Sequence, residues 1–192
     1  SARGRLGRFA RDARRARAGG GRPGISSVTT SQSLLSLLQL TDFTEAAFLL
    51  SVLGEGTFLD LLKFVERFAP DEATAVLAQK ARADETRHVH FGLAHVRHAR
   101  AADPSLYGRL EGAVRKRAAT MASASGVPAP VADALTILAA GGADPRGVRK
   151  GHEALRELME TMHENRVKRL EHAGFSPAQA KTLSDLHTPN FM

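Results

Sequence analysis

The stretch Ala83-Asp84-Glu85-Thr86-Arg87-His88-Val89-His90-Phe91-Gly92 lies within a long helical pattern and places a carboxylate and an imidazole three residues apart. Residues three apart on an α-helix share a face, so Glu85 and His88 can point the same way and bind one metal ion. A single Glu-x-x-His is a weak signal. The chain contains a second, Glu160-Thr161-Met162-His163, and a glutamate stands on the predicted helix before each of the two motifs.

The apolar periodicity of the chain around these motifs predicts an all-α protein. Ala, Leu and Arg are abundant, whereas there is no Trp and only one Tyr. Proline and glycine breaks separate the helical patterns, Asp42 is a predicted N-cap, and Gly174 a predicted C-terminal glycine. Helices are expected over residues 41–68 (or from 34), 71–100, 105–125, 131–140, 146–172 (or from 145) and 177–186. We therefore expect one helical domain over residues 34–192, preceded by an arm and linker over 1–33.

The positive charge of the chain is concentrated in the N-terminal arm. Residues 1–24 contain eight arginines and a single acidic residue, Asp12, and this segment accounts for the whole formal net charge of +7. The rest of the chain is close to neutral. A short arginine-rich segment is most often a solvated extension, and contact with nucleic acid or another acidic surface is the alternative interpretation.

Composition excludes several kinds of site. The chain has no cysteine, so disulfides, thiolate zinc sites and iron–sulfur clusters are excluded. Any metal must therefore be held by His, Asp or Glu, a set that suits iron, manganese or zinc. Neither an apolar run of about 18 residues nor an apolar signal core is present. We therefore expect a cytoplasmic protein without a membrane contact.

Four glutamates and two histidines stand at corresponding heights on the predicted helices. Glu55 lies about 14 residues before the first interhelix break and Glu85 about 14 after it, so antiparallel neighbours at ~1.5 Å per residue bring them to the same height. Glu111 and Glu160 mirror this arrangement in the second half. Several buried carboxylates would be costly without cations, and metal ions would remove that cost. The candidate metal ligands and catalytic residues are Glu55, Glu85, His88, Glu111, Glu160 and His163. On the last long helix, we expect the inward face to hold Leu155, Met159, Glu160, His163, Val167 and Leu170.

Glu111 fits this geometry less well than the other five. The short turn at Asp103-Pro104 places it about seven residues into its helix, whereas His88 lies about twelve or more from the end of the preceding helix. At ~1.5 Å per residue the mismatch is about 8 Å. Asp133 is the alternative ligand in this half of the chain.

The order Glu, Glu-x-x-His, Glu, Glu-x-x-His resembles the ligand set of the ferritin-like di-iron carboxylate proteins, and the resemblance covers residues 42–172. Asp84-Glu85-x-x-His88 is more similar to the oxygenase and ribonucleotide-reductase-like branches than to storage ferritins. The resemblance implies a ferritin-like four-helix bundle with short accessory helices and a basic N-terminal arm. It also implies two bound iron ions at the six residues named above, with a manganese–iron pair as the alternative.

The function implied by this resemblance is that of an O2-dependent oxidoreductase, a monooxygenase or hydroxylase. The expected substrate is a small organic molecule or a modified nucleoside, and the expected partner is a separate electron-donor protein. A homodimer is among the expected assemblies. Two alternatives stay open: a ferritin-type iron-oxidising or storage protein, and a non-catalytic helical bundle in which the motifs are coincidental. The metal content of the purified protein distinguishes the last of these from the others.

Overall fold

The structure is a computed structural model that describes residues 35, 37–120 and 129–187. The expected arm and linker over residues 1–33 lie outside this part of the chain. Every regular element within it is helical, which confirms the all-α prediction. None of these helices combines the length and the apolar character that crossing a membrane requires.

The described helical boundaries lie close to the predicted ones, and the predicted end of the 105–125 helix lies outside the described residues. The Asp42 carboxylate accepts a hydrogen bond from the Glu45 N–H (2.9 Å), and Asp71 caps the next helix in the same way through Thr74 (2.7 Å). Gly174 has a φ of 95°, the left-handed conformation that ends a helix at glycine. The elements are α3 (Phe43–Ala47), η1 (Phe48–Glu55), α4 (Gly56–Arg67), α5 (Glu72–Ala102), α6 (Leu106–Thr120), α7 (Ala129–Ala140), α8 (Pro145–His172) and α9 (Pro177–His187).

Element η1 is a π-helix, which the apolar periodicity did not predict. It continues α3 directly and leads directly into α4, and Glu55 is its last residue. The Gly56 N–H donates to the Ser51 carbonyl, five residues back, which is the π-helical pattern. Gly54 and Gly56 have low helix propensity, so the α-helical alternative is weakened on both sides of Glu55. Short π-helical segments are rare and often occur at functional sites.

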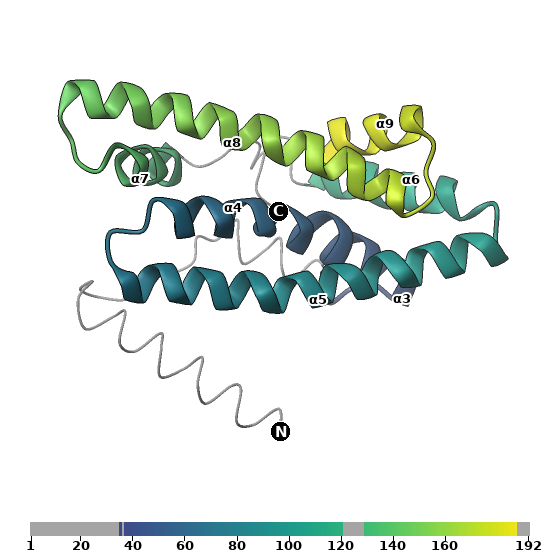
Figure 1. Cartoon of the computed structure of the whole chain (residues 1–192). Coiled ribbons are helices and arrows are strands. Elements are labelled where there is room, and N and C mark those ends of the chain that lie inside the picture. The colour runs from purple at the N-terminus through teal and green to yellow at the C-terminus, as the bar shows by residue number, and fades with distance from the viewer. Residues whose placement is uncertain (1–34, 36, 121–128, 188–192) are drawn as a thin grey trace.

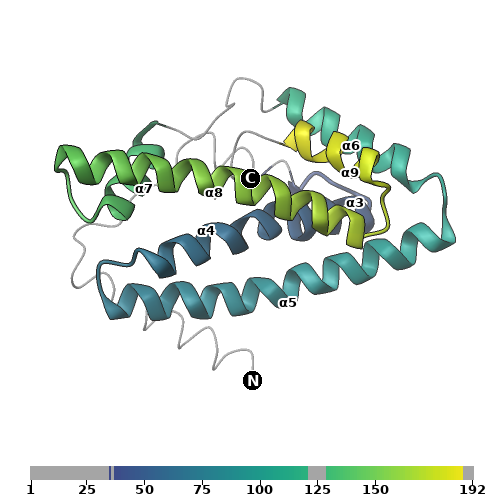
Figure 2. The same cartoon turned by 45° about the horizontal axis from the view of Figure 1, so that its top comes forward.

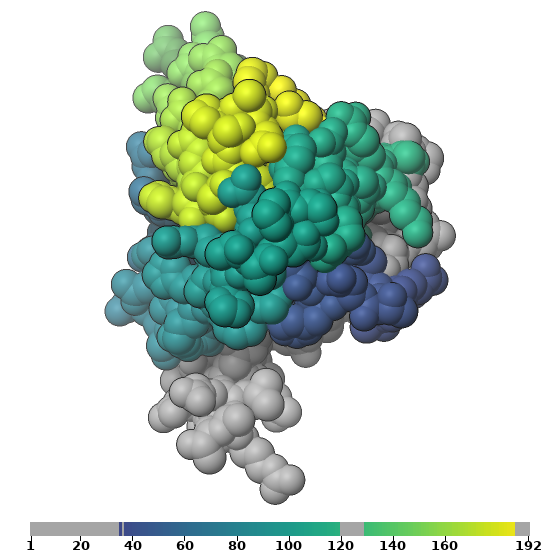
Figure 3. Space-filling model, turned by 90° about the vertical axis from the view of Figure 1, so that its right-hand side faces the viewer, coloured from purple at the N-terminus to yellow at the C-terminus, as the bar shows by residue number. Residues whose placement is uncertain are grey.

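The helices are arranged around α4 (Figures 1 and 2). It lies between α5 and α8 and packs against both, whereas α5 and α8 contact each other little. At one end α7 lies along the N-terminal half of α8. At the other end α9 packs against both α8 and α6, and Figure 3 shows α9, α6 and α3 gathered on that end of the molecule.

Two apolar clusters stabilise the fold. Each large aliphatic or aromatic side chain that is fully buried contributes about 1.5–3 kcal/mol. The smaller cluster lies between α4, α7 and α8 and consists of Phe64, Leu135, Leu158 and Met162. The larger joins η1, α5, α6, α8 and α9 and consists of Phe48, Leu49, Val52, Leu53, Val96, Leu106, Leu110, Val114, Leu170, Ala173, Phe175, Ala180 and Leu183.

A buried polar layer lies on the face of α4 that packs against α8. Arg166 is only 2% exposed, and its guanidinium donates to Thr57 Oγ1 and to Ser184, at 3.4 Å in each case. Burial lowers the pKa of Arg166 to about 10, which still leaves it charged at neutral pH. Arg169 lies 3.5 Å from Asp60, whose other oxygen accepts from the Asn165 amide (2.7 Å). The layer therefore places two arginines against one carboxylate.

The buried face of α8 agrees with the expected one in part. Leu170 is fully buried, and Leu155, Met159 and Val167 pack against the two apolar clusters as expected. The buried side chains recur every fourth residue at Leu158, Met162, Arg166 and Leu170, whereas Glu160 is exposed. The outward position of Glu160 is the departure from the prediction. The physical reason is Arg166, which Thr57 of α4 and Ser184 of α9 hold in the interior.

A close contact between α7 and α8 leads to a stability prediction. A Cβ added at Gly151 would lie 2.1 Å from the Thr136 carbonyl oxygen, a backbone atom of α7 that cannot move aside alone. We expect Gly151→Ala to lower the free energy of unfolding by about 1–3 kcal/mol, measured by urea denaturation. Gly112→Ala is the control, because nothing lies within 4 Å of its added Cβ. In this control, the higher helix propensity of Ala should raise the free energy of unfolding by about 0.5–1 kcal/mol. An equal change in the free energy of unfolding of both variants would contradict the close contact between Gly151 and Thr136.

Candidate metal centre

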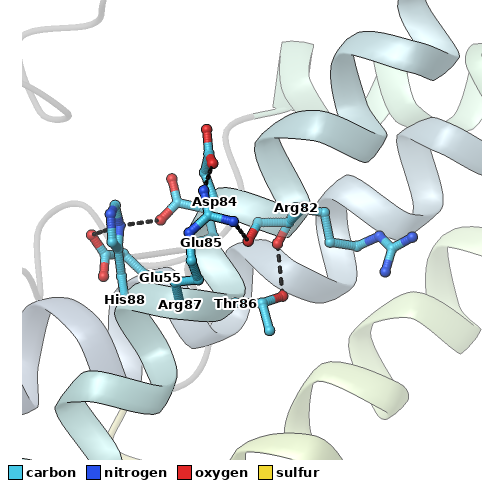
Figure 4. A network of polar contacts seen from close by, with 8 residues as sticks. Glu55, Arg82, Asp84, Glu85, Thr86, Arg87 and His88 are labelled. Carbon is cyan, nitrogen blue, oxygen red and sulfur yellow. Dashed lines mark hydrogen bonds and ion pairs between the residues drawn. The ribbon is translucent and has the colours of Figure 1, made fainter. Parts of the chain in front are cut away.

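Glu55, Glu85 and His88 come together at the junction of η1, α4 and α5. Figure 4 shows the three side chains pointing toward one another. His88 Nδ1 lies 3.1 Å from a Glu85 oxygen and 3.4 Å from a Glu55 oxygen, and one ligand atom from each residue lies within 4.8 Å of the others. Metal–ligand bonds of about 2.0–2.2 Å with ordinary bond angles place neighbouring ligand atoms about 2.8–3.6 Å apart. The two distances measured from His88 therefore fall within the range for ligands of one divalent cation.

The local helical structure explains why these residues meet. Gly92 on α5 faces η1, and an added Cβ there would lie 2.7 Å from Ser51 Cβ. His88 lies one turn before Gly92 on α5, and Glu55 lies about one turn after Ser51 on the neighbouring element. The close approach of the two backbones at Gly92 therefore brings the two helices within ligand distance of a common ion.

The three groups differ in exposure. The Glu55 side chain is 19% exposed, that of Glu85 30% and that of His88 57%, so the centre opens to solvent on the imidazole side. Glu55 Oε2 is buried and has no hydrogen-bond partner among the described residues. Burial, and then the negative charge of Glu55, raise the pKa of the Glu85 carboxyl, while His88 opposes the shift. A cation at this point would satisfy the orphaned oxygen and offset the repulsion between the carboxylates.

Charged neighbours of the centre have their own partners. Asp84 forms an ion pair with Arg87 on the exposed side of α5. Arg82 donates to Glu66 on α4 (2.8 Å) and so ties the two antiparallel helices together one turn from Glu85. These cations are therefore engaged elsewhere, and His88 is the group that faces the two carboxylates.

The structure does not bring the other predicted ligands into this group. The Glu111 carboxylate accepts hydrogen bonds from Arg115 (2.6 and 2.9 Å), which, together with Tyr107, lowers its pKa. His163 contacts Ser184 Oγ on α9 through Nδ1 (3.1 Å). Glu160 is exposed on α8, and Asp133 is exposed on α7.

Two features of the structure were not predicted from the sequence. The π-helix that positions Glu55 has no periodic signature in an apolar segment, although the glycines on either side of Glu55 are a weak signal of irregularity. The polar layer around Arg166 was also missed. An arginine placed four residues from Met162 and four from Leu170, on one face of the helix, is the signal that could have revealed it.

Two cavities lie away from the three ligand groups. One of about 150 Å³ opens between α4 and α8 and is lined by Asp60, Phe64, Arg67 and Leu158 among others. The other, of about 160 Å³, is lined by residues that include Leu40, Leu49 and Arg117. Neither lining includes Glu55, Glu85 or His88, so neither cavity connects directly with the candidate metal ligands.

The raised pKa of Glu85 predicts that, without metal, the difference in stability between the wild-type protein and the variant Glu85→Gln depends on pH. Because folding raises this pKa, protonated Glu85 favours the fold, and its contribution is lost as the pH rises through the folded-state value. Glu85→Gln mimics the protonated form, so we expect a higher Tm than wild type at pH about 7.5 and no difference at pH about 4. Each kcal/mol gained shifts Tm by roughly 2–4 °C in a chain of this size.

Thermal unfolding in the presence of a chelator measures this difference. The matched control is Glu164→Gln, which changes an exposed glutamate on α8 and should give the same Tm difference at both pH values. A wild-type Tm above that of Glu85→Gln at neutral pH would show that the ionised carboxylate stabilises the metal-free fold, contrary to the geometry.

Comparisons with known proteins give no family for this chain. No family model matches it, and neither a curated protein nor a solved structure matches it. The resemblance to the ferritin-like proteins therefore stays a prediction from the motifs. The functional interpretation rests on the geometry of Glu55, Glu85 and His88.

Proposed function

We propose that this chain binds a divalent transition metal, iron or manganese, through Glu55, Glu85 and His88. The observation that carries the proposal is the position of His88 Nδ1, which faces carboxylate oxygens from two different helical elements at 3.1 and 3.4 Å. A proton on this nitrogen can be shared with the carboxylates in the metal-free protein. A metal ion would take the place of that proton.

The donor set fits the proposed ions. One imidazole nitrogen and carboxylate oxygens are ligands for iron and manganese, and zinc accepts the same set. One buried Glu55 oxygen has no hydrogen-bond partner among the described residues, and a cation would satisfy it and offset the repulsion between Glu55 and Glu85. Because the chain has no cysteine, ions that prefer thiolates are disfavoured.

Bound iron would supply O2-dependent redox chemistry, and we propose an oxidoreductase function on that basis. The support is the pattern of two Glu-x-x-His motifs, each preceded by a glutamate, which is typical of di-iron carboxylate proteins with a four-helix bundle. Within the chain, the carboxylates of Glu55 and Glu85 would hold the cation and balance its charge, and His88 would complete the protein ligands. An organic substrate and an electron-donor protein are the partners that the hydroxylase form of this proposal requires.

The exposure of the centre favours a second form of the proposal, which is oxidation of iron itself. The His88 side chain is 57% exposed, so ions can enter and leave directly from solvent. Hydroxylation of an organic molecule benefits from a site that excludes water. An open centre, with the two cavities lined by other residues, is better suited to iron as the substrate than to an organic molecule.

Metal titration of the purified chain tests the proposal. We expect Mn²⁺ or anaerobic Fe²⁺ to bind, and Glu85→Gln or His88→Gln to weaken binding by at least about 100-fold, because each removes a direct ligand. Isothermal titration calorimetry and metal analysis give the affinity and stoichiometry. His98→Gln, at an exposed position on the same helix, is the matched control and should bind normally. Undiminished binding in both ligand variants would refute the proposal.

Variants of α8 then show whether Glu160 and His163 of the same chain also bind the metal. If the three ligand groups act without α8, Glu160→Gln and His163→Gln retain wild-type affinity. If the six predicted ligands converge within one chain, both variants lose metal as Glu85→Gln does. Exposure of the ferrous protein to O2, followed by its optical spectrum, then tests the redox part of the proposal.

A further inference from the structure

The candidate centre is incomplete within the described residues. Glu55, Glu85 and His88 supply three ligand groups, whereas iron, manganese and zinc take about four to six ligands. Within the described ranges no other His, Asp or Glu joins the group. The remaining coordination positions face the open side, where His88 is exposed and where water or a further side chain can occupy them.

The same side of the protein carries two exposed phenylalanines. Phe91 lies three residues after His88 on α5 and therefore on the same face of that helix. Its ring contacts that of Phe43 in an edge-on arrangement with centroids 6.4 Å apart, and His95 lies against both rings. Phe43 is 62% exposed and Phe91 57%. Exposed aromatic side chains in mutual contact are typical of a surface that another protein covers.

Resting on the proposed metal-binding function, we propose that a second copy of this chain covers the open side and that the two copies together hold a pair of divalent metals. A two-fold axis beside His88 would bring the same surface of each copy against the other, which is the commonest symmetry of protein dimers. Each copy contributes the antiparallel pair α4 and α5 together with Glu55, Glu85 and His88. Two such pairs make four helices with two Glu-x-x-His motifs and two further glutamates, the ligand set of a di-metal four-helix centre.

The carboxylate charges at the proposed interface link dimer formation to metal binding. Each copy brings two carboxylates to the interface, so the dimer brings four, and two divalent cations balance them. Without metal the carboxylates of the two copies repel one another across the axis. The dimer is therefore linked to metal binding, and the exposed phenylalanines supply its apolar contact.

The structure favours a second copy over α8 as the source of the missing ligands. His163 is already held by Ser184, and Glu160 faces outward from α8. Bringing these two residues to the centre would require rotation of α8 and removal of Arg166 from the buried polar layer. Association of two copies requires no such rearrangement, because the open side is already at the surface.

Sedimentation velocity of the full chain with and without Mn²⁺ tests the inference. Metal should convert a species of one chain, 20.6 kDa, into one of about 41 kDa, and a chelator should reverse the change. Metal analysis should give one ion per chain. Electron paramagnetic resonance of the Mn²⁺ protein should show an exchange-coupled pair, because ions in such centres lie about 3.5–4 Å apart.

Two lysine variants separate the interface from the metal ligands. Phe91→Lys places a charge on the proposed interface without changing a ligand, and it should weaken the metal-linked dimer by at least about tenfold. Ile137→Lys makes the same kind of change at an exposed apolar residue of α7, and its dimer should be unaffected. Both positions are exposed, so both variants should fold.

The possible outcomes distinguish this inference from the proposed function. Binding of Mn²⁺ by a monomer with a single-ion resonance signal would overturn the shared centre and leave the metal-binding function standing. A dimer that persists in chelator and in His88→Gln would also overturn it, because its assembly would not depend on the metal. Failure of the chain to bind metal at all would refute the proposed function itself.

Discussion

The close contact between α5 and η1 at Gly92 is the constraint on which the candidate centre depends. Only a residue without a Cβ allows the two backbones to approach as they do, because the added atom would overlap the side chain of Ser51. His88 and Glu55 lie one turn away from this contact on their respective elements. Their separation is therefore set by helix packing and by the contact between His88 and Glu85, and the centre is built on rigid elements rather than on a loop.

Helix α4 separates two charged regions of opposite sign. On its α5-facing side, Glu55 at the end of η1 meets Glu85 and His88 of α5, whereas on its α8-facing side Asp60 of α4 lies beside Arg169, near the buried Arg166. Gly56 permits this arrangement, since an added Cβ would lie 2.6 Å from Arg169 Nε. Residues 55 and 56 therefore serve different regions although they are adjacent in the chain. The positive layer keeps α8 fixed in the rotation that turns Glu160 outward.

The helical elements and their ends were predictable from the sequence, because caps such as Asp42 and Asp71 and the glycine at 174 act locally. The pairing of Glu55 with Glu85 and His88 was also predictable, since antiparallel helices joined by a short turn fix the relative height of their residues. The burial of Arg166 on α8, and with it the outward position of Glu160, was not predictable. It depends on partners that α4 and α9 provide for Arg166, and a pattern based on apolar residues excludes an arginine from the core. The π-helix was missed because it changes the pitch of a segment in which most side chains are apolar, so no polar residue marks the shift.

The π-helix makes the geometry of Glu55 depend on the number of residues before it. Segment 48–55 accommodates its chain with wider turns than an α-helix of the same length would have. Each residue of an α-helix turns the next by about 100°, and a residue in the wider π-helical turn contributes less than that. If the segment closed into an α-helix with the same number of residues, Glu55 would therefore leave the side occupied by His88. A regular α-helical rod with one amino acid fewer would carry this carboxylate on nearly the same side, so helical pitch and residue number can be exchanged during evolution while the orientation of the candidate ligand is kept.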